Sequence, residues 1–198
     1  MHRIYLGRLP EHDPLHGYIQ HDIQPQISAS GSSTYRVFRL HGSNDVYLYE
    51  DRHSGTKVIG NFFLSSRKKD GVKAISRLTR EFENLCLMRD YGLTGYPHHV
   101  VRPLRRHYSM NALLVTEYCE GELLSDVIRE VIQNGNHGKL YHTLTALAYF
   151  LSAFHNRTAI GVGVEFHQDC EYMDRLINSL REIRALKTEE AGVHSVSN

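Results

Sequence analysis

The first clear pattern in the chain is an alternation of apolar and polar residues in three successive runs. The runs cover residues 34–40, 46–50 and 57–64 and are rich in residues that favour β-strands. Clusters of turn-forming residues at 41–45 and 51–55 separate them. Because short turns join neighbouring strands in antiparallel pairs, the pattern predicts a three-stranded antiparallel meander.

The apolar period changes after residue 70. Apolar residues three and four positions apart predict a helix over residues 70–91. Its apolar stripe is formed by Val72, Ile75, Leu78, Phe82, Leu85 and either Leu87 or Met88. Residues 100–108 and 112–118 then predict a hairpin that completes a sheet of about five strands.

Helical patterns dominate the remainder of the chain, including a long apolar stretch at 140–154. Residues 1–30 are rich in His, Pro, Gln and Ser and have weak periodicity, so an extended or partly ordered arm is expected there. The sequence therefore predicts an α+β fold in three parts. These are the arm at 1–30, a strand-rich lobe at 31–118 and a helical part at 119–198.

Composition excludes several classes of function. The 23 Lys and Arg against 22 Asp and Glu give a net charge of +1, so we expect neither a nucleic-acid surface nor an anionic-membrane surface. No apolar run approaches the ~20 residues that cross a bilayer. Three scattered cysteines indicate a reducing cytoplasm, and no histidine or cysteine spacing predicts a metal site.

The order of three strands, one helix, two strands and then helices resembles the protein kinase fold. The likeness is greatest to the aminoglycoside phosphotransferase and choline kinase side of that superfamily, and it covers roughly residues 35–180. Residues 114–124 (LVTEYCEGELL) are the most similar segment, because they resemble the fifth strand and the hinge. The resemblance implies the N-terminal lobe, and the first helices of the C-terminal lobe, of an ATP- and Mg²⁺-dependent small-molecule phosphotransferase.

Within this resemblance, Gly42, Ser43 and Asn44 match the loop that covers the nucleotide phosphates, although an ordinary hairpin turn has the same composition. Asn61 occupies the position at which the family carries a phosphate-binding lysine. Glu81 matches the helix glutamate that pairs with that lysine; the alternative is a solvent-facing glutamate. A neutral amide contributes no charge, so we expect weak ATP·Mg binding or none.

The hinge match implies that the backbone of Glu117, Tyr118 and Cys119 binds the adenine edge. A generic strand–turn–helix is the alternative interpretation of this segment. With the phosphate-loop residues and the Asn61–Glu81 pair, these three residues complete the expected nucleotide site.

The catalytic loop of the family has one weak counterpart in this chain. His167-Gln168-Asp169 resembles its His-x-Asp motif, with Asp174 where the family has a magnesium-binding Asn. No Asp follows residue 174 to supply the second magnesium ligand. Asp169 is therefore only a candidate catalytic residue, and its alternative role is to precede a helix.

Three functions remain open from the sequence. The chain is a nucleotide-binding piece of a kinase-like phosphotransferase that is not competent alone, a pseudokinase-like interaction module, or an unrelated α+β binding domain. Few residues follow the apolar stretch at 140–154 to cover it. We therefore expect an exposed apolar helix surface that supports homo-oligomerisation or binds a protein partner.

Overall fold

The computed structural model describes residues 3–27, 34–40, 45–64, 70–135 and 137–159, together with Arg175 and Asn178. The chain divides into two compact units, residues 1–158 and 159–198. The strands and helices between Arg3 and Thr158 belong to the first unit.

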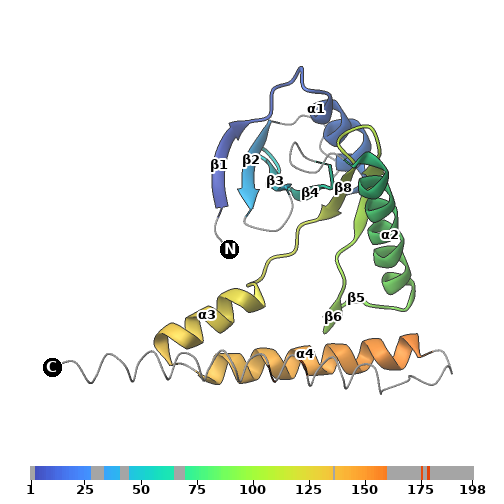
Figure 1. Cartoon of the computed structure of the whole chain (residues 1–198). Helices are drawn as coiled ribbons and strands as arrows, with labels where there is room; N and C mark the ends of the chain where they lie inside the picture. Colours follow the sequence, from blue (N-terminus) through green and yellow to red (C-terminus); the bar gives the residue numbers. More distant parts are fainter. Residues whose placement is uncertain are drawn as a thin grey trace, which may run out of the picture. The chain divides into compact units, whose positions relative to one another are not determined.

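The first unit is built on a six-stranded antiparallel sheet with the strand order β1-β2-β3-β4-β8-β7 (Figure 1). Its strands are β1 (Arg3–Arg8), β2 (Tyr35–Leu40), β3 (Asp45–Asp51), β4 (Lys57–Phe62), β7 (Pro103–His107) and β8 (Leu113–Glu117). β5 (Thr94–Gly95) and β6 (His98–His99) form a separate small hairpin. The α+β class and the antiparallel sheet are thus confirmed, with one more strand than expected.

The N-terminal region differs from the expected extended or partly ordered arm. β1 pairs with β2 at the edge of the sheet, and α1 (Pro14–Tyr18), η1 (Ile19–Ile23) and η2 (Gln24–Gln26) follow it. Ile19 and Ile23 are 2% and 0% exposed, because they pack into the main core. The Gln24 side chain also donates a 3.2 Å hydrogen bond to the buried Asp51 carboxylate. Burial and pairing make this region part of the fold.

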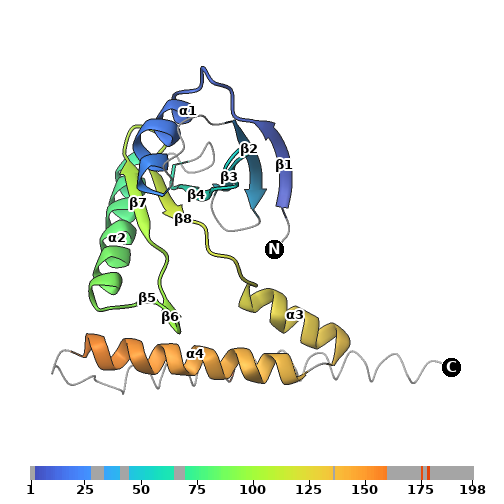
Figure 2. The same ribbon diagram turned by 180° about the vertical axis from the view of Figure 1, so that it is seen from behind.

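Helix α2 (Gly71–Asp90) lies along the β7–β8 end of the sheet (Figures 1 and 2). It begins at Asp70, whose side chain accepts a hydrogen bond from the Lys73 N–H in the usual manner of an N-cap. Its buried side differs from the expected stripe, because Val72 and Ile75 are exposed. The residues that pack against the sheet are Ala74, Leu78, Phe82 and Leu85.

The two faces of the sheet carry different clusters. Leu113 and Val115 of β8 join the core beneath the N-terminal turns, whereas Leu114 joins the cluster under α2. This division follows from the alternation of side chains along a strand. Asn61 lies opposite Leu114 in the β4–β8 register and therefore shares the α2 face.

Two helices follow the sheet, α3 (Leu124–Asn134) and α4 (His137–Thr158), which matches the predicted helical character. Lys139 of α4 bonds Glu130 of α3 at 2.7 Å. α4 has no buried residue, and its Tyr141 and Tyr149 are each 69% exposed. Among the described residues, no helix combines the length and apolarity needed to span a bilayer.

Candidate functional site

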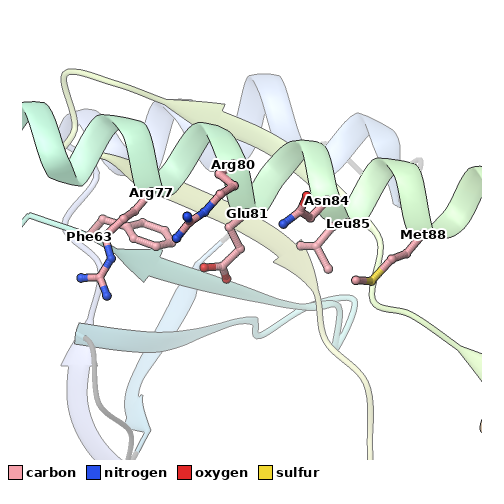
Figure 3. Close-up of a pocket in the computed structure, with 7 residues that line it drawn as sticks. All are labelled: Phe63, Arg77, Arg80, Glu81, Asn84, Leu85 and Met88. Atoms are coloured by element: carbon pink, nitrogen blue, oxygen red, sulfur yellow. The ribbon is translucent and has the colours of Figure 1, made fainter. Parts of the chain in front are cut away.

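A cavity of about 370 Å³ lies where α2 meets the end of β4 (Figure 3). It falls in the size range of small-molecule sites. Phe63 comes from the segment just after β4, and all other lining residues come from α2. These are Arg77, Arg80, Glu81, Asn84, Leu85 and Met88.

Glu81, which lines the cavity, connects α2 to the sheet. A hydrogen bond with the Asn61 side chain on β4 works to lower the pKa of the Glu81 carboxyl. The structure thus brings together the two residues that the kinase resemblance pairs, although they are 20 positions apart in the chain. The Asn61 side-chain oxygen is buried and has no hydrogen-bond partner among the described residues. It is a free acceptor beside the cavity.

The pKa of the Glu81 carboxyl depends on burial and on the Arg77 guanidinium. Burial raises the pKa of the Glu81 carboxyl, while the Arg77 guanidinium and the Asn61 hydrogen bond oppose that shift. Arg77 is one helical turn before Glu81, and Arg80 lines the same cavity. Two guanidinium groups and one carboxylate leave the cavity with a net positive charge when Glu81 is ionised. Such a site suits an anion.

Arg77, Arg80 and Asn84 were not predicted as site residues. A signal for them exists in the sequence, because the cavity-lining positions 77, 80, 81, 84, 85 and 88 follow helical spacing. The apolar positions under α2 define the buried side of the helix, and the polar flank of that side faces the cavity. The signal is weak, since most amphipathic helices carry charged residues there.

The predicted hinge lies at the end of β8, beside β4. Val58 of β4 is opposite Glu117, so the segment after β8 emerges next to the start of β4. The Glu117 N–H donates to the Arg102 carbonyl oxygen at 3.0 Å and is therefore already bonded. The backbone of Tyr118 and Cys119 forms the rest of the predicted hinge, and Cys119 is exposed.

The side chain of Tyr118 is held by two cations. Arg3 of β1 donates a hydrogen bond to its hydroxyl and lies 5.3 Å from the ring centroid. Lys57 Nζ lies 5.2 Å from the same centroid and 3.1 Å from Glu120 Oε1. Lys57 is therefore bound to the hinge, where it does not replace the charge missing at Asn61.

The Glu117 carboxylate at the end of β8 is held by neighbouring hydrogen-bonding and charged groups. Its Oε1 accepts a 2.6 Å hydrogen bond from the Arg102 N–H, lies 2.7 Å from His99 Nε2 and lies 3.7 Å from Arg89 Nη1. Burial works to raise the pKa of this carboxyl, but the hydrogen bonds from Arg102 and His99 and the Arg89 charge together lower it. Burial and the Glu117 charge raise the pKa of the Cys119 thiol.

Four predicted site residues lie outside the described residues. Gly42, Ser43 and Asn44 belong to the segment at 41–44, and Asp169 belongs to the second unit. Their placement relative to Asn61 and Glu81 therefore stays a prediction.

The donors of the cavity fit ATP better than they fit Mg²⁺. Guanidinium groups match phosphate oxygens in charge and geometry. Magnesium requires oxygen ligands, usually one or two carboxylates together with the substrate phosphates. Glu81 is the one carboxylate that lines the cavity within the described residues, and Arg77 lies close to it.

No protein-family model, curated protein or solved structure matches this chain.

Proposed function

We propose that this chain is the ATP-binding portion of a kinase-like small-molecule phosphotransferase. The observation that carries the proposal is the hydrogen bond between Asn61 and Glu81. In the kinase arrangement, a lysine on the third strand pairs with a glutamate on the following helix, and the lysine contacts the nucleotide phosphates. Here Asn61 lies on β4 and Glu81 on α2, the helix that follows β4, and a hydrogen bond with Asn61 works to lower the pKa of the Glu81 carboxyl.

In this proposal Arg77 supplies the positive charge that Asn61 lacks. Its guanidinium lines the cavity beside Glu81 and can bind two phosphate oxygens at once. The adenine ring lies against the Cys119 backbone, at the opposite end of β4. Supporting this placement, β4 carries Asn61 near one end and pairs with Glu117 near the other.

The proposal is tested by nucleotide titration in solution. In a ¹H–¹⁵N spectrum, added ATP should shift the side-chain amide signal of Asn61. Arg77→Ala should weaken ATP binding about tenfold or more, because it removes a charge-assisted contact. Lys73→Ala is the matched control, since it removes one positive charge from α2 at an 83% exposed side chain outside the cavity. Equal losses of ATP affinity in both variants would mean that Arg77 acts only through its general charge, and they would refute the proposed site.

A non-catalytic, pseudokinase-like role is the second candidate, and the neutral Asn61 favours it. Nucleotide binding requires fewer polar groups than phosphate transfer does. In the described part of the chain, Glu81 is the one carboxylate that lines the cavity. Under this alternative ATP binds to the chain, but the full-length protein releases no ADP with any phosphate acceptor. A steady ADP release that Arg77→Ala abolishes would refute the non-catalytic role.

A further inference from the structure

Three side chains with metal-binding atoms meet at the end of β8. His99 on β6, Glu117 at the last position of β8 and Cys119 two residues later each offer one ligand atom. These three atoms all lie within 4.8 Å of one another. They come from two segments of the chain, which is why no spacing motif in the sequence marks them.

The two ring nitrogens of His99 face different groups. Its Nδ1 lies 3.1 Å from the Thr94 carbonyl oxygen, and its Nε2 lies 2.7 Å from Glu117 Oε1. Nε2 is therefore the nitrogen that faces the other candidate ligands, and the ring is held at Nδ1 by the backbone.

Backbone groups fix both ligands in place. The Thr94 carbonyl orients His99, and the Arg102 N–H donates to Glu117 Oε1 at 2.6 Å. Metal-ligating histidines usually donate their second ring N–H to a carbonyl or a carboxylate, and ligating carboxylates are themselves hydrogen-bonded. Both supports of a metal site are thus present.

We propose that His99, Glu117 and Cys119 bind a divalent transition metal of the zinc type and leave a fourth coordination position open. Nitrogen, carboxylate oxygen and thiolate sulfur are the donors that Zn²⁺ prefers. Tetrahedral bonds of the usual length place ligand atoms about 3.4–3.8 Å apart. For a metal to bind, His99 Nε2 and Glu117 Oε1 must move apart from 2.7 Å by about 1 Å. Any two ligand atoms near the 4.8 Å limit must approach each other by about 1 Å.

The charge balance of the site admits such an ion. A carboxylate and a thiolate together neutralise a divalent metal, and binding displaces the thiol proton. Arg89 is the opposing charge, with Nη1 3.7 Å from Glu117 Oε1. The same Nη1 donates to the Val100 carbonyl oxygen at 2.6 Å, which holds it to the backbone. The proposal does not rest on the ATP-binding function, because it uses the side chains of His99, Glu117 and Cys119, whereas the ATP site uses the Cys119 backbone and the α2 cavity.

Cobalt(II) is the probe, because a bound thiolate gives a ligand-to-metal charge-transfer band in the near ultraviolet. The full chain carrying Cys86→Ser and Cys170→Ser retains Cys119 as its one thiol. Titration of this variant should give the charge-transfer band together with the intense visible bands of tetrahedral cobalt. Adding Cys119→Ser should abolish the charge-transfer band. Adding His99→Ala should weaken cobalt binding tenfold or more, and Zn²⁺ should displace the cobalt.

His142→Ala is the matched control, since it removes an exposed histidine on α4 and should leave the titration unchanged. His99→Gln, which keeps a polar side chain, replaces His99→Ala if circular dichroism shows that the alanine variant is unfolded. Absence of the charge-transfer band in the Cys119-only chain would overturn the proposal. A band that persists unchanged after the His99 substitution would also overturn it, because the metal would then be bound by the thiol without the site.

Discussion

Gly60 on β4 is a position where an added methyl group should destabilise the fold. An alanine Cβ there would lie 2.8 Å from Tyr49 Cε2 and 3.3 Å from Leu113 Cδ1. Favourable contacts between carbon atoms begin at about 3.5 Å. Both neighbours belong to the main core, where Tyr49 is 4% and Leu113 0% exposed, so neither can move freely.

We expect Gly60→Ala to lower the free energy of unfolding by about 1–3 kcal/mol, the usual cost of overpacking a filled core. Alanine regains about 0.4–1 kcal/mol by restricting the unfolded chain, which offsets only part of that loss. Urea unfolding followed by circular dichroism measures the difference. Gly71→Ala is the control, because its Cβ would meet nothing within 4 Å at the start of α2.

The result that refutes this reasoning is a Gly60→Ala variant as stable as the wild type while Gly71→Ala behaves as expected. The Tyr49 ring would then have room to move, and the packing of β3 against β4 and β8 would be looser than the structure shows.

Three further predictions concern burial, charge and association. Ile23→Ala should cost about 2–5 kcal/mol in urea unfolding, because Ile23 is 0% exposed, whereas Ile132→Ala at a 79% exposed site should change stability by less than about 0.5 kcal/mol. The Glu117 carboxyl has a lowered pKa, so the stability it contributes is present above its ordinary pKa. Thermal unfolding should therefore show the wild type losing its advantage over Glu117→Gln as the pH falls through that lowered pKa. The exposed apolar residues of α3 and α4 should produce self-association in sedimentation at rising concentration, and a concentration-independent monomer would contradict this.

The elements with a strong local period could be predicted from the sequence. The meander of β2, β3 and β4 is encoded by alternation and turn residues, and α2 by its three-and-four spacing. The exposed surface of α2 shows the limit of that reasoning. Val72 and Ile75 fit the spacing but are exposed, because the sheet contacts the side of α2 that carries Ala74 and Leu78. The period gives the type of element, whereas the partner decides which side is buried.

The N-terminal region could not be predicted from local pattern. β1 is an edge strand with Ile4, Tyr5 and Leu6 all more than half exposed, so its strand conformation depends on pairing with β2. The turns after α1 are a π-helix and a 3₁₀-helix, which do not follow the 3.6-residue period. Tertiary contacts of Ile19 and Ile23 hold these turns in place.

The candidate site was partly predictable for a similar reason. The resemblance in the order of elements singled out Asn61 and Glu81, and in the structure a hydrogen bond with Asn61 works to lower the pKa of the Glu81 carboxyl. Arg77 and His99 had no motif to mark them. Each acquires its surroundings only when a helix or hairpin is folded against the sheet.

The central claim is that the Asn61–Glu81 pair marks a nucleotide site with reduced charge. Calorimetric titration of ATP·Mg into the wild type and into Asn61→Lys tests it most directly. We predict that the wild type binds more weakly than low-micromolar, and that the lysine strengthens binding about tenfold or more through one charge-assisted contact. A wild type that binds with a low-micromolar or tighter constant, or an Asn61→Lys variant that folds but binds no better, would contradict the account.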